Sequence, residues 1–329
     1  MYMGMEWECL SEKALSGGTV SRGEALAVLK SGEDEILAVM NAAFKVRLRH
    51  FGRGMNLQVL QNAKSGLCSE NCAFCSQSAV ADSGIAQYPM KSVEEIVEGA
   101  REAKKLNAVR YCIVTSNRSP SSKDLETVCE AVRRIKKEMS IQVCTSLGLL
   151  TPEQARTLAD AGVNRYNHNF ETSLRYYPSI CQTHTYEDRV RTVKTARQAG
   201  LEICCGGLIG MGETLEDRVE LAFAVKDGAA NSIPVNFLDP RAGTPLADRS
   251  RLKPTECLRT LAMFRLVNPS SEIRIAGGRE ACLRRLQPLA LYAANSIFTE
   301  GYLTTPGQGY SADIAMIEEA GFEIAQIEA

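Results

Sequence analysis

The sequence has few of the features that mark membrane proteins, nucleic-acid-binding proteins or zinc fingers. No apolar run approaches the roughly 18 residues that a membrane-spanning helix needs. Basic and acidic residues number 38 and 39, so a net charge of −1 provides no positive surface for nucleic acid or anionic lipid. The three histidines show no H-x3-5-H spacing. We therefore expect no nucleic-acid partner and no membrane partner.

Cysteine usage indicates the compartment and the chemistry. The first residues, MYMGMEWECLSEK, are acidic and lack the basic segment and apolar stretch of a secretory signal, so we expect a cytoplasmic protein. The 12 cysteines are many for that compartment, where thiols stay reduced. Clustered cysteines there favour metal binding or catalysis over disulfides.

Short apolar runs alternate with amphipathic stretches along most of the chain. Eight pairs of a strand and a helix favour a closed α/β barrel of the (β/α)8 TIM type, with a doubly wound open sheet as the alternative. Three helical patterns end in a glycine, at Gly162, Gly200 and Gly228. The predicted strands are 57–62, 110–115, 141–146, 165–170, 202–206, 232–237, 273–276 and 295–298.

The chain divides into three predicted parts. Residues 1–50 predict an N-terminal helical extension, with a capping box at Ser21 and Glu24. Residues 51–310 predict the barrel, and residues 311–329 a C-terminal helix and tail. In such a barrel the active site lies at the C-terminal ends of the strands.

Three cysteines follow the first predicted strand in the segment CSENCAFC. Cys68, Cys72 and Cys75 have C-x3-C-x2-C spacing. A closed zinc site needs four ligands, and the chain has no second C-x2-C pair. Three thiolates can instead hold three irons of a cubic iron–sulfur cluster and leave the fourth iron open to a small molecule. We therefore favour a cluster over zinc or unligated core thiols.

This spacing, with the aromatic Phe74 directly before the last cysteine, resembles the radical S-adenosylmethionine (SAM) superfamily. The resemblance implies that Cys68, Cys72 and Cys75 form the catalytic centre as ligands of a 4Fe–4S cluster. It also implies that the open iron binds SAM and that Phe74 contacts the adenine.

The glycine-rich segment GGLIGMGET follows the fifth predicted strand. It lacks the G-K-[ST] of a P-loop, and by itself it fits a tight strand-to-helix turn. The resemblance implies a loop that contacts the cofactor through Gly206, Gly207 and Glu213, where absent side chains let backbone approach. It also implies that Glu171 accepts the ribose hydroxyls.

Cys112, Cys144 and Cys204 lie on three different predicted strands. A lone buried cysteine is most often a small core residue, and we interpret Cys129 and Cys257 in this way. Thiols that face inward from three strands would instead converge on the barrel axis, where they could hold a second metal centre. No role is assigned to Cys9, Cys181 and Cys282.

Longer segments narrow the resemblance to the biotin synthase family over about residues 45–310. It implies an auxiliary iron–sulfur cluster on Cys112, Cys144 and Cys204, with Arg274 as an unusual fourth ligand. A guanidinium normally stays protonated and cannot donate a lone pair to a metal. Without the resemblance, Arg274 would therefore be interpreted as the partner of a carboxylate. The segments are YNHNFETS (166–173), THTYEDR (183–189), GGLIGMGET (206–214), GTPLAD (243–248), IRIAGGRE (273–280) and AANSIFTEGYLTT (293–305).

Cys205 departs from the family pattern, in which a small hydroxyl residue is commoner. Adjacent strand residues point to opposite faces, which makes Cys205 an outward core thiol. A local turn at the following glycines would instead bring the sulfurs of Cys204 and Cys205 inward together. We hypothesise that Cys205 alters the auxiliary cluster, from a 2Fe–2S to a four-iron form.

Asparagines provide candidate substrate contacts. Asn167 and Asn169 share one face of the fourth predicted strand, and Asn236 lies on the sixth. Each amide offers a hydrogen-bond donor and an acceptor. These groups could simply satisfy polar atoms at the strand ends, or, as the resemblance implies, they could bind the ureido ring of dethiobiotin. His168 alternates to the other face, where we expect a structural role.

The resemblance implies a sulfurtransferase that converts dethiobiotin to biotin. A 5′-deoxyadenosyl radical from SAM would abstract hydrogen, and the auxiliary cluster would donate the sulfur. It also implies a low-potential electron donor such as flavodoxin or ferredoxin, and a homodimer. The alternatives are another radical SAM enzyme, of the hydrogenase-maturation type, and a non-catalytic iron–sulfur protein.

Overall fold

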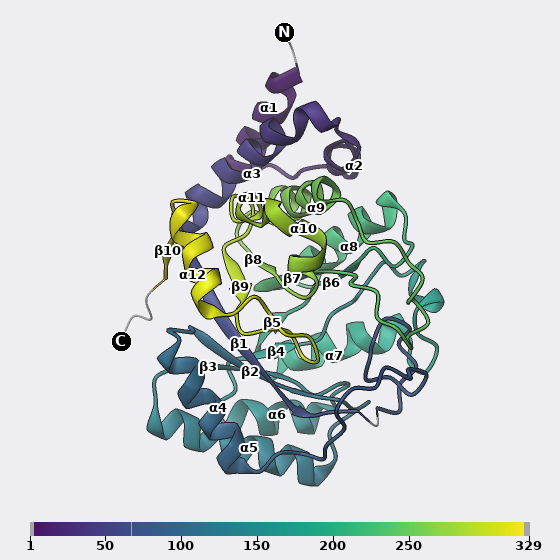
Figure 1. The fold of residues 1–329 in the computed structure, drawn as a ribbon, viewed down its shortest axis with the longest axis vertical. Helices are drawn as coiled ribbons and strands as arrows, with labels where there is room; N and C mark the ends of the chain where they lie inside the picture. The colour runs from purple at the N-terminus through teal and green to yellow at the C-terminus, as the bar shows by residue number, and fades with distance from the viewer. Residues whose placement is uncertain (1–2, 67, 326–329) are drawn as a thin grey trace.

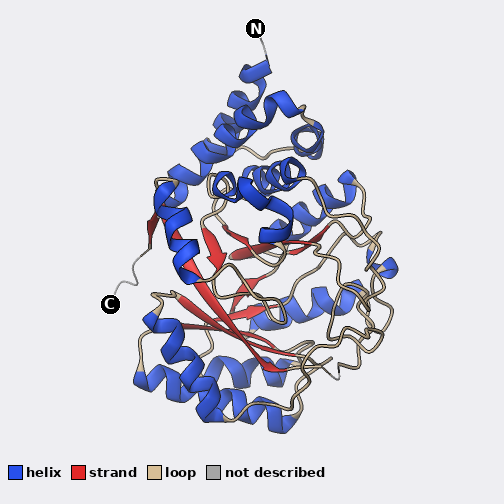
Figure 2. Cartoon of the chain, in the orientation of Figure 1, coloured by secondary structure: helices blue, strands red, loops and turns tan. Residues whose placement is uncertain are grey.

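The computed structural model describes residues 3–66 and 68–325 (Figures 1 and 2). Residues 1–2 of the predicted extension and 326–329 of the predicted tail lie outside the described residues. Parallel strands form the centre, and helices surround them. None of the helices in the described part of the chain is long and apolar enough to cross a membrane.

The central sheet closes into a barrel. β9 pairs with β8 on one side and with β1 on the other, and all pairings are parallel. The (β/α)8 prediction is therefore confirmed, and the open sheet is excluded. In their order around the barrel, the strands are β1 (Gly54–Lys64), β2 (Arg110–Thr115), β3 (Gln142–Ser146), β4 (Arg165–Asn167), β5 (Glu202–Cys204), β7 (Ser232–Phe237), β8 (Glu272–Ile275) and β9 (Ser296–Phe298).

The predicted fifth strand, 202–206, is shorter in the structure, and a further short strand follows it. β5 ends at Cys204, and β6 (Gly207–Ile209) continues beside β7 after a break at Cys205 and Gly206. A Cβ atom on Gly206 would lie 2.0 Å from the carbonyl oxygen of Pro234. Only glycine fits this approach, so backbone packing requires it there.

Helices with strong N-terminal caps cover the barrel. Ser92, Thr151, Thr185 and Thr214 each open a capping box. The helices and 3-10 turns are α4 (Val93–Lys105), α5 (Ser122–Glu138), α6 (Pro152–Asp160), η2 (Tyr177–Ser179), α7 (Tyr186–Gln198), α8 (Leu215–Asp227), α9 (Pro254–Val267), α10 (Arg279–Leu283), η3 (Arg284–Leu286) and α11 (Gln287–Ala290).

Two of the three predicted glycine ends are confirmed. Gly162 and Gly200 follow α6 and α7 with positive φ angles of 97° and 86°. The prediction for Gly228 is wrong in detail, because Gly228 keeps a helical φ of −71° at the end of α8. Ala229 takes the left-handed conformation instead, with φ of 51°.

The N-terminal extension is helical as predicted, with α1 (Met3–Leu15), α2 (Arg22–Lys30), η1 (Glu33–Glu35) and α3 (Ile36–Phe51). These helices gather at one end of the molecule beside α9 (Figure 1). The capping box at Ser21 and Glu24 is present. At the other end of the chain, α12 (Tyr310–Glu319) leads into β10 (Glu323–Ile324), which pairs with the start of β1.

Candidate functional site

A cavity of about 260 Å³ lies at the C-terminal ends of the strands and extends into the barrel. The loop that carries Tyr302 covers part of it, and Thr304 in this loop bonds Ser76 of the cysteine loop (Oγ1–Oγ 2.9 Å). One cavity therefore contacts both the three-cysteine loop and the barrel interior. Its walls include Phe74, Cys75, Cys112, Cys144, Asn167, Asn169, Glu171, Asn236 and Arg274.

The three-cysteine loop follows β1, as predicted. The amide of Cys75 donates to the carbonyl of Cys72 at 3.1 Å, and the amide of Ala73 donates to that of Ile180 at 2.9 Å. Burial raises the pKa of Cys75 to about 11 and also raises that of Cys68. Among the described residues, the three thiols are not all within 4.8 Å of one another. In the structure they therefore do not form a compact single-ion site.

Glu171 lies on the cavity wall near this loop. Its φ of 68° is in the left-handed region, and its carbonyl accepts from the amide of Leu208 at 2.8 Å. Arg189 faces its carboxylate, with Nη1 at 3.7 Å from Oε1. Burial raises the pKa of Glu171, although Arg189 opposes the shift. Glu171 and Phe74 therefore share the cavity wall.

In the glycine-rich segment, Leu208 lines the cavity, whereas Gly206, Gly207 and Glu213 do not. Glu213 accepts from the amides of Gly210 and Met211, both at 2.8 Å, and from Nε of Arg218 at 2.8 Å. A Cβ atom on Gly207 would lie 2.4 Å from the carbonyl oxygen of Glu171. Gly206, Gly207 and Glu213 thus shape the loop and lie outside the cavity lining.

The predicted ligands in the barrel interior come together. Cys112 and Cys144 are register partners on β2 and β3, and both line the cavity. Cys204 accepts from Nη2 of Arg274 at 3.4 Å and from Nδ2 of Asn167 at 3.1 Å. The Arg274 guanidinium lies over the Phe298 ring, 4.7 Å from its centroid. Its buried Nε has no hydrogen-bond partner among the described residues.

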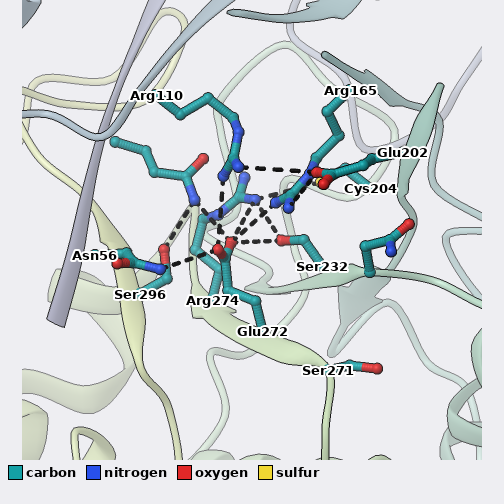
Figure 3. Close-up of polar contacts among 12 residues, drawn as sticks. Asn56, Arg110, Arg165, Glu202, Cys204, Ser232, Ser271, Glu272, Arg274 and Ser296 are labelled. Atoms are coloured by element: carbon teal, nitrogen blue, oxygen red, sulfur yellow. Dashed lines mark hydrogen bonds and ion pairs between the residues drawn. The ribbon is translucent and has the colours of Figure 1, made fainter. Parts of the chain in front are cut away.

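Sequence reasoning missed Glu272, which lies at the centre of this group (Figure 3). Its Oε1 accepts from Gln58 at 2.7 Å, from Ser232 at 2.7 Å and from Arg274 at 3.2 Å. Arg165 (3.4 Å) and Arg110 (3.5 Å) also contact the carboxylate. Glu272 and Arg274 are two apart on β8 and share a face, which was the available signal.

The charges in this group are mutually dependent. Burial alone would raise the pKa of Glu272, but Arg165, Arg110 and Arg274 hold it well below its ordinary value. Burial likewise opposes the charge of Arg274, whereas Cys204 and Glu272 raise its pKa. Arg274 is therefore a charged guanidinium whose direction is fixed by its partners.

The three asparagines predicted to contact the substrate differ in how many of their amide atoms already take part in hydrogen bonds within the protein. Asn167 and Asn169 both line the cavity, and Asn169 Oδ1 accepts from the amide of Gly206 at 3.1 Å. Asn236 uses both amide atoms on backbone, with Gly207 O at 3.0 Å and Gly277 N at 2.9 Å. His168 is buried away from the cavity lining, and burial lowers its pKa.

Cys205 has different surroundings from Cys204. It belongs to the main hydrophobic core with Phe170, and burial raises its pKa. Its amide donates to the carbonyl of Ser232 at 2.9 Å. Neither Cys204 nor Cys205 is part of the cavity lining among the described residues, so the two differ in their neighbours: Arg274 and Asn167 for Cys204, and the hydrophobic core for Cys205.

Cys181, to which the sequence assigned no role, lies beside Cys72. The two sulfur atoms are 3.7 Å apart, and His184 Nδ1 is 3.4 Å from the sulfur of Cys181. The hydrogen bond from Cys72, helped by His184, lowers the pKa of Cys181, while it raises that of Cys72. The C-x2-H spacing of CQTH was the signal that could have revealed this pair.

Family comparisons agree with this geometry. The radical SAM superfamily matches residues 64–225, and the Biotin and Thiamin Synthesis associated domain matches residues 234–323. A methylornithine synthase structure is similar with a TM-score of 0.82 and 20% identity, over 96% of this chain and 97% of its own. An FeFe-hydrogenase maturase from Carboxydothermus hydrogenoformans has a TM-score of 0.82 and 18% identity, over 99% and 80%. Fold and site thus define a radical SAM enzyme.

Sequence relatives specify the family. A biotin synthase of Salinibacter ruber is 55% identical, over 98% of this chain and 90% of its own. Those of Geobacillus thermodenitrificans and Bacillus subtilis are 51% and 48% identical, over 97% and 98% of this chain and 96% and 95% of their own. The chain therefore belongs to the biotin synthase family. The hydrogenase-maturation and non-catalytic alternatives are not supported.

Proposed function

We propose that this chain converts dethiobiotin to biotin in the cavity between the three-cysteine loop and the barrel interior. The supporting observation is that one cavity is lined by Cys75 at one end and by Cys112, Cys144 and Arg274 at the other. Family membership implies a 4Fe–4S cluster and SAM. A substrate held between the two cysteine groups would be within reach of both.

Cys68, Cys72 and Cys75 would hold the 4Fe–4S cluster, because thiolates are the usual ligands of such clusters. Phe74 offers an aromatic face to the adenine, and Glu171 offers carboxylate oxygens to the ribose. Gly206, Gly207 and Glu213 would act indirectly by fixing the backbone of the cofactor loop. When bound, cluster and SAM supply a radical that takes hydrogen from an unactivated C–H bond.

Cys112, Cys144 and Cys204 would hold an auxiliary 2Fe–2S cluster, the source of the inserted sulfur, with Arg274 as the fourth ligand. Three buried thiols are a suitable soft donor set, and Nη2 of Arg274 lies 3.4 Å from the sulfur of Cys204. To act as a ligand, the guanidinium would have to give up a proton. Glu272 and Ser232 orient the guanidinium toward Cys204. Cys205 would remain a core thiol.

The asparagines would orient the substrate. Asn167 and Asn169 present amides to the cavity, and their donors and acceptors match those of a cyclic urea. Asn236 would act chiefly by holding the backbone of Gly207 and Gly277. The enclosing walls would keep water away from the reactive species.

Three further features belong to this proposal. A low-potential donor such as flavodoxin or ferredoxin would reduce the 4Fe–4S cluster, and the chain would act as a homodimer in the cytoplasm. Sedimentation of the purified chain tests the dimer. Replacement of a chemical reductant by reduced flavodoxin or ferredoxin tests the donor.

The deciding experiment is anaerobic incubation of the reconstituted full chain with dethiobiotin, SAM and a chemical reductant. Mass spectrometry should detect both biotin and 5′-deoxyadenosine. Cys75→Ala should lose both products. Cys144→Ala should lose biotin but retain some 5′-deoxyadenosine, because only the auxiliary site is changed.

Cys129→Ala is the matched control, since Cys129 is a buried thiol on α5 outside the cavity lining. It should retain both products. Full biotin formation by Cys75→Ala or Cys144→Ala would contradict the proposal, as would its absence from the wild-type chain with both clusters assembled.

A further inference from the structure

We propose that Cys72, Cys181 and His184 form a three-ligand site for a single tetrahedral divalent ion of the zinc class, with the fourth position open to water. The site would exist in the chain when the 4Fe–4S cluster is absent. Cys72 comes from the three-cysteine loop, whereas Cys181 and His184 precede α7. All three side chains are buried.

The distances suit a tetrahedral ion. With metal–sulfur and metal–nitrogen bonds of roughly 2.3 and 2.0 Å, two thiolates lie roughly 3.8 Å apart and a thiolate and an imidazole nitrogen roughly 3.5 Å apart. The sulfurs of Cys72 and Cys181 are 3.7 Å apart, and Cys181 is 3.4 Å from His184 Nδ1. All three ligand atoms lie within 4.8 Å of one another.

Two groups contact the His184 ring. Glu70 Oε2 contacts Nδ1 when no ion is bound and also accepts from Thr183 Oγ1 at 2.5 Å; an ion on Nδ1 would take the place of the Glu70 contact. Tyr177 contacts the other ring nitrogen of His184, with its hydroxyl 2.8 Å from Nε2. Arg189 donates to that hydroxyl at 2.6 Å. Metal-binding histidines are commonly held by such partners on the second nitrogen.

Both cysteines would bind as thiolates, and any proton that they still carry would go to solvent; His184 would bind through Nδ1 as a neutral imidazole with its proton on Nε2. Because Cys72 is shared, the ion and the 4Fe–4S cluster would exclude each other. This exclusion rests on the proposed function, in which Cys72 is a cluster ligand. The single-ion site itself does not depend on the proposed function. A chain loaded with zinc would be closed to cluster assembly until the ion leaves.

Cobalt(II) titration of the cluster-free full chain under anaerobic conditions tests the site. One cobalt per chain should bind with a near-ultraviolet band from cobalt–thiolate bonds, and zinc should displace it. Cys72→Ser and Cys181→Ser should each weaken binding by about tenfold or more. Cys75→Ser is the matched control and should bind as the wild type does, because Cys75 belongs only to the cluster.

Unchanged cobalt affinity and spectrum in Cys181→Ser would overturn the proposal. Equal weakening by Cys75→Ser and Cys72→Ser would also overturn it, since the ion would then sit in the three-cysteine loop. His184→Gln provides a second variant in case Cys181→Ser misfolds, and circular dichroism checks both. Loss of cobalt affinity in folded His184→Gln supports the site, and retention overturns it.

Cluster loading tests the exclusion separately. The cluster-loaded wild type should take up no cobalt, whereas Cys181→Ser should still assemble four irons and form 5′-deoxyadenosine. Equal cobalt binding with and without the cluster would overturn mutual exclusion. A failure of biotin formation would leave the cobalt titration unaffected, so the two proposals can fail independently.

Discussion

At the scale of single residues, Glu272 joins several buried charges. Its carboxylate contacts Arg110, Arg165 and Arg274, and it is itself buried. Removal of one partner from a buried charge group leaves the others uncompensated, which is more costly than the loss of an exposed ion pair. The orientation of Arg274 toward Cys204 therefore depends on a residue outside the cavity lining.

Glu272→Gln should lower the free energy of unfolding by about 3–5 kcal/mol at neutral pH, because three guanidinium groups lose their shared carboxylate. Urea denaturation measures this change. Glu202→Gln is the matched control, since Glu202 also contacts Arg165 (2.7 Å) but its side chain is 46% exposed. The control should cost about 0–1 kcal/mol. Equal losses in both variants would contradict the expected role of burial.

The same carboxylate predicts a pH dependence. The folded-state pKa of Glu272 is lowered, so its stabilising contribution is present above the ordinary value of 4.5 and is lost as the pH falls through the folded-state pKa. The stability difference between the wild type and Glu272→Gln should therefore shrink as the pH is taken below 4.5. Urea titrations over that range measure it. A difference that grows on acidification would have the wrong sign.

Cys204 and Cys205 should behave differently despite being adjacent. Cys204 contacts Arg274, whereas Cys205 packs in the main core. Cys204→Ser should lower the iron content of the anaerobically purified chain and change its Mössbauer spectrum. Cys205→Ser should leave both unchanged, apart from a stability cost of about 1–3 kcal/mol for the buried hydroxyl. Loss of iron in Cys205→Ser would instead favour the four-iron form.

At the scale of elements, the break between β5 and β6 is set by close backbone packing. Gly206→Ala would place a Cβ atom against the carbonyl oxygen of Pro234 on β7. We expect a loss of about 1–3 kcal/mol in the free energy of unfolding, measured in urea. Gly23→Ala in α2 is the control, because its Cβ atom meets nothing within 4 Å. An unchanged free energy of unfolding in Gly206→Ala would show that the backbone between β5 and β6 can move to accommodate the added methyl group.

At the scale of the whole molecule, Arg47 on α3 joins the two ends of the chain to the barrel. It donates to the carbonyls of Ala294 (3.2 Å) and Gly54 (2.9 Å), and its guanidinium lies 4.4 Å from the Phe322 ring centroid. Burial lowers the pKa of Arg47 to about 10, which leaves it charged at neutral pH.

Arg47→Met should therefore lower the free energy of unfolding by at least about 2 kcal/mol, because several hydrogen bonds to a charged donor are lost. Hydrogen exchange should accelerate together in α3 and in the segment around Phe322. Arg49→Met, at an exposed position of the same helix, should change neither. Faster exchange in α3 alone would show that the two chain ends are held independently.

The elements and the cysteine loop were accessible from the sequence because their signals are local. Alternating polarity, capping residues and the spacing of Cys68, Cys72 and Cys75 all act within a few neighbouring residues. The eight barrel strands were located in this way, within a few residues of their observed bounds. The left-handed Ala229 was missed, because an adjacent glycine is the usual choice for that conformation.

The sequence by itself determined the barrel, the position of the three-cysteine loop and, through long shared segments, the family. Only the tertiary structure brought Glu272 into contact with three arginines. It also placed Cys181 beside Cys72, which is 109 residues away in the chain. The physical reason is that such contacts depend on strand register and on loop paths across the barrel. Neither leaves a periodic or short-range signal in the chain.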